Sequence, residues 1–218
     1  MKTTLLAVIA FVFEITCFGQ EIELNSSLST SSEQRFQGSP GIGLQYQHGI
    51  SSKFQVGFGL QYNFKKSEFD HIPFIDADPT LIVAEKINSN SQRFSLRLNI
   101  QRLLKDNENV SVSVGPEISY NYVWGEDKID QRLEQSPWHN IYSQKLGLAN
   151  DIGLGLYSKI EIKKIIIPEL SLSVGIRPEI LIGKRMMVFG GEAPVFSGSI
   201  GFIECQIGLI YSFKKNCP

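Results

Sequence analysis

The chain has 218 residues, a formal net charge of −1 and 42% hydrophobic residues. This length suits one domain, and the near-neutral charge without a large basic patch gives no reason to expect a nucleic-acid partner. Beyond the N-terminus no apolar stretch is long enough for a membrane-spanning helix, which excludes a helical membrane protein but not a membrane-spanning β-barrel.

Residues 1–19 have the pattern of a signal peptide. Lys2 supplies the positive start, an apolar run extends from Leu5 to Phe13, and a small-x-small cleavage site ends at Gly19. The sequence therefore predicts export, with residues 20–218 forming the mature domain. Of the two cysteines that remain, Cys205 lies in the middle of a predicted strand, too far from Cys217 for an intrachain disulfide.

The next elements are strands with one apolar and one small or polar face. Between Phe54 and Phe64 every second residue is large and apolar, and each residue between is Gln, Gly or Asn. Because successive side chains of a strand point to opposite faces, this run has an apolar face and a polar face. The same period, with varying clarity, predicts eight strands, at residues 21–30, 41–48, 54–64, 93–102, 110–124, 142–162, 168–182 and 196–213.

The connections alternate in length. Those at 50–52, 105–109 and 163–167 are short, and those at 31–40, 65–92, 125–141 and 183–195 are long. Tight periplasmic turns and extended external loops are typical of outer-membrane barrels. The long loops at 65–92 and 125–141 contain weak helical periods, at 78–88 and 126–135, which suggest short helices. Asn150 interrupts the apolar face of the sixth strand and predicts a bulge or a change of register.

Alternation by itself does not tell whether the apolar face meets lipid or a core, since a soluble lipocalin-like barrel would bury it. The polar face is rich in Gly and Ser, and its few charges are of both signs. A narrow lumen in which charges pair explains this better than a water-exposed surface does. The residues predicted to form a structural polar network in that lumen are Arg97, Glu117, Asp151, Arg177, Glu179 and Glu204.

Aromatic residues gather near the predicted strand ends, as in the aromatic girdles of membrane barrels. Near the C-terminus, Gln206, Gly208, Tyr211 and Phe213 form the pattern polar-x-Gly-x-x-aromatic-x-aromatic. This resembles the C-terminal signal by which outer-membrane barrels are recognised for insertion, although five residues follow the usual last aromatic. With the signal peptide, it makes the chain similar to the small eight-stranded outer-membrane barrels of the OmpA-barrel and OmpX type. The resemblance implies an all-β, antiparallel up-and-down transmembrane barrel in a Gram-negative outer membrane, with lipid and the barrel-insertion machinery as partners.

Candidate catalytic residues are few. The histidines are His48, His71 and His139, and only the last two fall in predicted external loops, where Asp and Ser residues are available. Neither a Gly-x-Ser-x-Gly turn nor the His-x-Ser pair of outer-membrane lipid A deacylases is present. Scattered histidines without a Cys-x-x-Cys pair also predict no metal or cofactor site.

The function expected from the sequence is that of a non-enzymatic outer-membrane barrel whose external loops contact surface partners or support the envelope. An eight-stranded lumen is just filled by side chains, so an open solute channel is not expected. Three alternatives remain open at this point: a component of a secretion or assembly system with periplasmic partners, a lipid-modifying enzyme, and a narrow porin.

Overall fold

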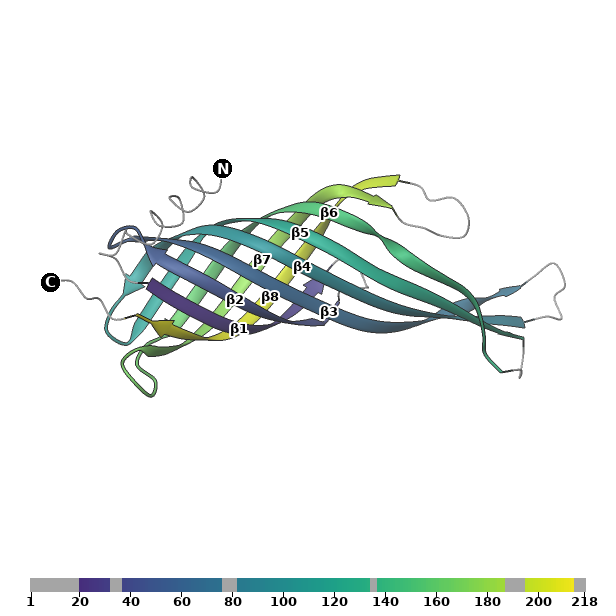
Figure 1. Cartoon of the computed structure of the whole chain (residues 1–218), viewed down its shortest axis with the longest axis horizontal. Helices are drawn as coiled ribbons and strands as arrows, with labels where there is room; N and C mark the ends of the chain where they lie inside the picture. The colour runs from purple at the N-terminus through teal and green to yellow at the C-terminus, as the bar shows by residue number, and fades with distance from the viewer. Residues whose placement is uncertain (1–19, 32–36, 76–81, 134–136, 187–194, 214–218) are drawn as a thin grey trace, which may run out of the picture.

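The computed structural model describes residues 20–31, 37–75, 82–133, 137–186 and 195–213. Within these residues the chain forms eight strands joined into a closed barrel, and each strand pairs antiparallel with its neighbours in sequence (Figure 1). The barrel closes where β1 pairs with β8, as at Leu24↔Leu209. The strands are β1 (Gln20–Ser31), β2 (Ser39–Gly49), β3 (Phe54–Ile75), β4 (Ile82–Asp106), β5 (Val110–Leu133), β6 (His139–Ile162), β7 (Leu170–Met186) and β8 (Val195–Ser212).

The predicted up-and-down eight-stranded barrel is thus confirmed. No helix among the described residues is long and apolar enough to cross a membrane. The predicted signal peptide at 1–19 and the thiol of Cys217 lie outside the described residues, whereas Cys205 is a free, exposed thiol on β8.

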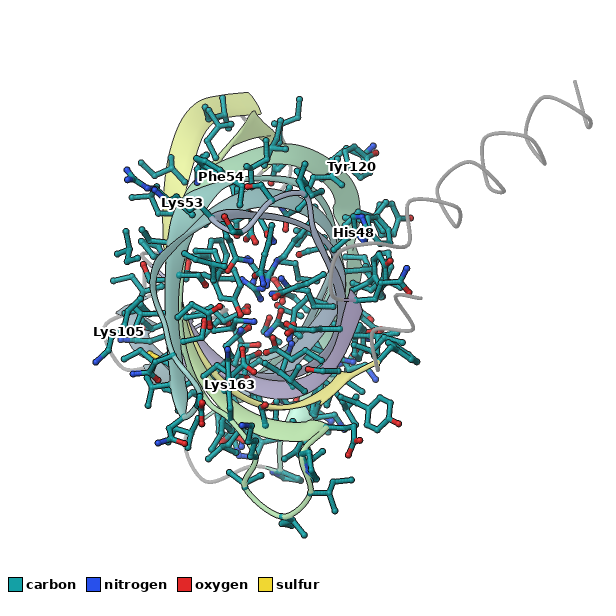
Figure 2. The ribbon with its side chains drawn as sticks, turned by 90° about the vertical axis from the view of Figure 1, so that its left-hand side faces the viewer. His48, Lys53, Phe54, Lys105, Tyr120 and Lys163 are labelled. Carbon is teal, nitrogen blue, oxygen red and sulfur yellow. The ribbon has the colours of Figure 1, made fainter. Side chains whose placement is uncertain are left out.

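Most large apolar side chains point outward, and most small and polar ones point into the lumen, where the described residues also include buried Tyr157, Leu181, Phe202 and Ile210. Leu24 and Ile42 are exposed by 63% and 62%, whereas Gln45 and Gln101 are exposed by 1% and 0%. Viewed along the barrel axis, nitrogen and oxygen atoms gather inside the ring of strands (Figure 2). A soluble barrel would bury the apolar side, so this arrangement is the one that fits hydrocarbon around the barrel. The predicted orientation of the two faces is confirmed.

The strands on one side of the barrel are much longer than predicted. β3 continues to Ile75 and β4 begins at Ile82, while β5 continues to Leu133 and β6 begins at His139. Most of the predicted loops at 65–92 and 125–141 is therefore strand, and the helical segments expected at 78–88 and 126–135 are wrong for residues 82–88 and 126–133. Beyond the membrane both faces of a sheet meet water, so the apolar alternation used to find strands is absent there.

The added strand segments at 65–75, 82–92, 125–133 and 139–141 are called the β3–β6 extension below. Pairing between them supplies their backbone hydrogen bonds, as at Ser67↔Ser89 and Asn90↔Glu126. Figure 1 shows β3 to β6 running together past the rest of the barrel, at the end opposite to the short turns. The change of register expected near Asn150 is present, because the β5–β6 pairs pass from Val123↔Ala149 to Gly125↔Leu146.

Candidate functional site

The middle of the lumen holds three arginines and three glutamates from four different strands. β4, β5, β7 and β8 each contribute, and every one of the six side chains is buried. Their formal charges cancel, which is the condition under which ions tolerate a narrow interior. The six residues, called the ionic cluster below, are Arg93, Arg97, Glu117, Arg177, Glu179 and Glu204.

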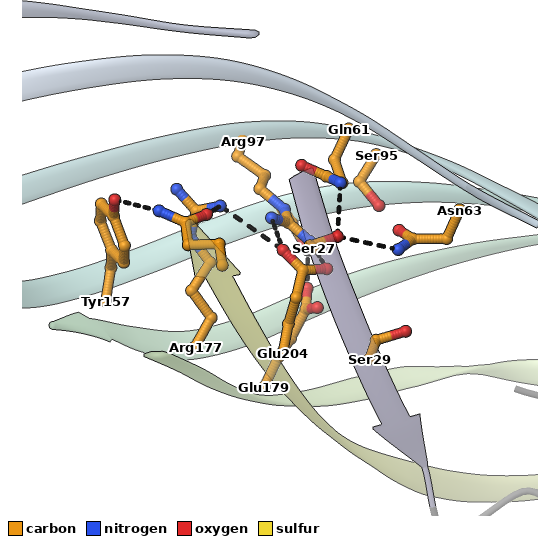
Figure 3. A network of polar contacts seen from close by, with 12 residues as sticks. Ser27, Ser29, Gln61, Asn63, Ser95, Arg97, Tyr157, Arg177, Glu179 and Glu204 are labelled. Atoms are coloured by element: carbon orange, nitrogen blue, oxygen red, sulfur yellow. Dashed lines mark hydrogen bonds and ion pairs between the residues drawn. The ribbon is translucent and has the colours of Figure 1, made fainter. Parts of the chain in front are cut away.

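Glu204 is the centre of the ionic cluster. Arg97 donates two hydrogen bonds to its carboxylate, from Nη1 at 2.7 Å and from Nη2 at 3.0 Å. Arg93 Nη2 donates a third at 3.1 Å, and Arg177 Nη1 lies 3.6 Å from Oε1. Figure 3 shows Arg97, Arg177 and Glu204 beside one another. Paired hydrogen bonds between a guanidinium and a carboxylate are strong and orient both groups. Glu204 therefore ties β8 to β4, which lies on the other side of the lumen.

The other two glutamates extend the ionic cluster to further strands. Glu117 lies 3.3 Å from Arg177 Nε, which links β5 to β7. Glu179 lies 3.4 Å from Arg93 Nη1 and accepts a hydrogen bond from Asn121 Nδ2 at 3.2 Å. Each carboxylate thus has an arginine partner and at least one further polar contact or cation nearby, which offsets the cost of removing it from water.

A second set of polar contacts lies nearer the short turns. Lys159 Nζ donates to Gln47 Oε1 at 2.7 Å and lies 3.8 Å from Glu23 Oε2. Glu23 Oε1 in turn accepts a hydrogen bond from Ser173 Oγ at 3.0 Å. These side chains come from β6, β2, β1 and β7, so this level of the lumen is also crossed by polar contacts.

Two aromatic rings cover guanidinium groups of the ionic cluster. The Tyr157 ring centroid lies 3.9 Å from Arg177 Cζ, and the Phe202 ring centroid lies 4.3 Å from Arg93 Cζ. The Tyr157 hydroxyl also accepts a hydrogen bond from Gln206 Nε2. Cation–π contacts of this kind are strengthened where water is excluded. The rings therefore lie directly against two of the three guanidinium groups of the ionic cluster.

On the other side of the ionic cluster, amides and hydroxyls join β1, β3 and β4. Gln61 Nε2 donates to Ser27 Oγ at 2.8 Å, and Asn63 Nδ2 donates to the same oxygen at 3.3 Å. Asn63 Oδ1 accepts from Arg93 Nη2 at 3.2 Å, which connects this layer to the charges. Polar contacts thus lie inside the lumen at three successive levels.

Five of the six residues predicted for a lumen network come together in the ionic cluster: Arg97, Glu117, Arg177, Glu179 and Glu204. The sixth, Asp151, is fully buried on the lumen side of β6.

Four lumen residues were not predicted from the sequence: Arg93, Lys159, Glu23 and Tyr157. The alternation of side chains between the two faces of a strand could have identified them. Arg93 shares a strand face with Arg97, and both Tyr157 and Lys159 share one with Asp151, so each had to point inward. Glu23 follows from the same rule in the weak first strand.

The predicted insertion motif divides between the two faces of β8. The Gln206 side chain is buried in the lumen, and Gly208 lies on the same inner face. Tyr211 and Phe213 point outward, with ring centroids 5.4 Å apart in an edge-to-face arrangement. Two residues of the motif therefore face the lumen, and its two aromatic rings face lipid.

The histidines do not converge on one another. His71 and His139 are in strands rather than loops, paired through their backbones with Glu85 and Gln131. They belong to β3 and β6, which are separated by β4 and β5, and His48 lies on β2. Among the described residues no group of three His, Cys, Asp or Glu could hold a metal ion.

The exposed apolar side chains on the outer face form a band around the barrel, called the lipid-facing belt below. On β3 and β5, aromatic side chains lie at the end of this belt. Tyr62 and Phe64 stack with centroids 6.1 Å apart, and Trp124 lies 6.2 Å from Tyr62 and 5.2 Å from Tyr122. They were predicted to lie near strand ends, but both strands continue past them. The rings mark the edge of the membrane rather than the edge of the sheet, because amphipathic rings prefer the interface.

Beyond these rings the outward side chains of the β3–β6 extension become polar. A hydrophilic groove of about 490 Å³ lies here across β3, β4 and β5. Near it, Lys86 pairs with Glu68, and Asp130 accepts a hydrogen bond from Asn88 Nδ2 at 3.0 Å. The residues lining the groove are Lys66, Ser67, Glu68, Asn88, Ser89, Asn90, Glu126 and Lys128.

No protein-family model matches the chain, and no curated protein matches it. Solved structures do. OprG from Pseudomonas aeruginosa matches with a TM-score of 0.52 at 12% identity, over 89% of this chain and 96% of that one. A major outer membrane protein from Thermus thermophilus matches with a TM-score of 0.51 at 14% identity, over 90% and 99%. Neisserial surface protein A matches with a TM-score of 0.46 at 13% identity, over 89% and 97%. At these identities the likeness concerns the fold.

Proposed function

Because this chain belongs by its fold to the small eight-stranded outer-membrane barrels, we propose that it is a closed, non-enzymatic barrel that presents the β3–β6 extension at the cell surface as a binding surface. The lipid-facing belt on a barrel of this fold supports the outer-membrane location predicted from the sequence. The terminal motif on β8 is the part of the chain that the barrel-insertion machinery would recognise.

The observation that carries the proposal is the set of polar contacts inside the lumen. Side chains bond there at three levels, and two of these levels join facing strands: Glu204 of β8 is bound by Arg97 and Arg93 of β4, and Lys159 of β6 donates to Gln47 of β2. A hydrated ion would have to displace several charge-assisted hydrogen bonds to pass, each of them stronger than a neutral one. Passage of solutes is therefore not the function that this interior favours, and the narrow-porin alternative is the weaker one.

A conductance measurement tests the closed lumen. Purified, refolded protein in a planar lipid bilayer is expected to give no steady single-channel current above that of the bare membrane. The matched variant is the double substitution Arg97→Ala and Glu204→Ala, which shortens two facing side chains and is expected to raise the frequency of openings. Regular conductance steps in the unchanged protein would overturn the proposal.

The second half of the proposal concerns which end of the barrel faces outward. The β3–β6 extension is the larger structure beyond the lipid belt, and its groove carries both charges and amides. Such a surface can bind a polar partner through hydrogen bonds without exposing apolar area. At the opposite end, the described part of the chain forms the short β2–β3, β4–β5 and β6–β7 turns.

Lysines at the two ends provide a direct test of this orientation. Lys66 and Lys128 are exposed on the extension, while Lys53 and Lys105 are exposed at the short turns (Figure 2). On intact cells, an amine reagent carried on a polymer too large for porins is expected to modify the first pair and spare the second. Lysed cells, in which all four should react, serve as the control. Preferential labelling of Lys53 and Lys105 on intact cells would reverse the orientation and end this part of the proposal.

A further inference from the structure

The β6–β7 turn carries the most exposed apolar side chain at the end of the barrel opposite to the extension, among the described residues. Ile166 is exposed by 80%, and its neighbours Ile165 and Ile167 by 39% and 46%. Three consecutive isoleucines on a protruding turn form an apolar patch that water does not favour. The other turns at this end have fewer apolar residues: the β2–β3 turn contains two serines and a lysine beside Ile50, which is exposed by 50%, and the β4–β5 turn is Asn-Glu-Asn at 107–109.

The turn has a defined shape and is held by its neighbours. Ile165 N donates to Leu170 O at 3.0 Å, and Leu170 N donates to Ile167 O at 3.0 Å. Lys163 N donates to Asn109 O in the β4–β5 turn, and the Lys163 ammonium pairs with Asp106 there. Its backbone also enters the left-handed region at Lys164, where φ is 59°. The isoleucines are therefore displayed by a fixed turn.

The turn is directed sideways, away from the barrel axis. Figures 1 and 2 share their vertical axis, and in both views the green turn between β6 and β7 projects below the barrel wall. In that direction it continues the lipid-facing belt, because Ile160 and Ile162 of β6 and Val174 of β7 are exposed on the outer face. A partner in the aqueous periplasm would approach along the axis instead.

Residues of the types that favour the membrane–water interface, a lysine and two aromatic residues, lie near the isoleucines. The aromatic pair at the end of β8 lies on the neighbouring strand, because Leu170 pairs with Tyr211. Lys164 is exposed beside the isoleucines, and a lysine can lay its aliphatic stem on apolar surface while its ammonium group reaches phosphates. The turn thus has the features of a segment that lies in the interface of a bilayer.

We propose that the β6–β7 turn is a membrane anchor, and that its isoleucines insert among the acyl chains of the periplasmic leaflet of the outer membrane. The partner of this surface is the phospholipid bilayer. The assignment to the periplasmic leaflet rests on the orientation proposed above, whereas insertion of the turn into a bilayer is independent of the closed lumen.

Tryptophan fluorescence tests the anchor, because the chain has only two tryptophans, Trp124 and Trp138. Both are replaced by Phe, and a single reporter is introduced as Ile166→Trp. The protein is reconstituted in vesicles of phosphatidylethanolamine and phosphatidylglycerol, with or without lipids brominated along their acyl chains. The reporter is expected to emit at short wavelength and to lose about half or more of its intensity to the brominated lipids, as insertion below the headgroups requires.

The matched control is Glu108→Trp, placed on the adjacent β4–β5 turn, where Glu108 is exposed among charged and amide residues. It is expected to be quenched by aqueous acrylamide and little affected by the brominated lipids. Ile165→Trp repeats the measurement if Ile166→Trp does not give the heat-modifiable folded form. Acrylamide quenching of the turn reporters equal to that of the control, without quenching by the brominated lipids, would overturn the proposal.

Discussion

Replacement of Glu204 by alanine is expected to lower the free energy of unfolding by about 3–5 kcal/mol, the cost of removing one partner from a buried ion pair. The carboxylate receives three hydrogen bonds, two from Arg97 and one from Arg93. Without it, the carboxylate that remains within 4 Å of Arg97 among the described residues is Glu117, whose Oε1 lies 3.9 Å from Arg97 Nε. Urea titration of the protein in lipid vesicles, followed by heat-modifiable gel migration, measures the change.

Glu108→Ala is the matched control, because it removes an exposed carboxylate from a turn and is expected to change stability by less than about 0.5 kcal/mol. The double variant Arg97→Met and Glu204→Met removes both charges together. It is expected to be less destabilised than the sum of the two single Met variants, because neither charge is then left without its partner. Additive losses would show that Arg97 and Glu204 are not coupled. A Glu204→Ala variant as stable as the Glu108→Ala control would show that the ionic cluster contributes nothing to stability.

Gly115→Ala is expected to destabilise the barrel by about 3 kcal/mol or more, at or above the upper end of the usual cost of overpacking. A methyl group at this position would overlap the carbonyl oxygen of Ile100 and lie 2.8 Å from Cα of Gln101. Both obstacles are backbone atoms of the adjacent β4, so no side-chain rotation relieves the contact. Either β4 and β5 separate locally or the folded form is lost, and the folded fraction after refolding measures this directly.

Gly59→Ala is a closely matched control. It is also a lumen-facing glycine within a strand, but a methyl group there meets its nearest atom, the Leu44 carbonyl oxygen, at 3.6 Å. This is ordinary van der Waals contact, so the variant is expected to fold with nearly unchanged stability. Equal behaviour of the two variants would mean that the close approach at Gly115 does not limit the barrel.

The ionic cluster explains how polar residues can be both buried and abundant in this protein. In a soluble domain the interior is apolar and the surface polar, whereas here hydrocarbon covers the outside and the polar groups must satisfy one another. Glu179 and Glu117 illustrate the result, because each has an arginine from another strand within 3.4 Å. The bonds across the lumen connect strands that are not neighbours in the sheet, and so they stabilise the barrel against flattening.

Membership of the ionic cluster was only partly predictable. Charges of both signs on one strand face indicate a shared interior, which is how Arg97 and Arg177 were found. Arg93 stands at the start of the predicted fourth strand, on the same face as Arg97. That it lies well within the barrel wall, and not at a strand end, became evident only because β4 begins at Ile82.

The unpredicted length of β3 to β6 has a related cause. Within the membrane a strand shows itself by alternation, because lipid selects apolar residues for one face and the lumen selects small or polar ones for the other. At Lys66 and Lys128 both faces meet water, and that selection disappears. The pairing of β3 with β4 and of β4 with β5 is then the only thing that makes these residues strands, and pairing is a tertiary property.

What the sequence by itself determined is the barrel: its strand number, its up-and-down order and the side that faces lipid. The strand number follows from a period of two repeated in eight segments. The side that faces lipid follows from the small residues and the mixed charges of the other face, and the up-and-down order is what the resemblance to small outer-membrane barrels implies. Tertiary structure alone decided which charges meet across the lumen, how far the sheet extends beyond the membrane and where the isoleucine turn points. These depend on stagger between strands and on strand tilt, which place residues distant in sequence at one level of the barrel.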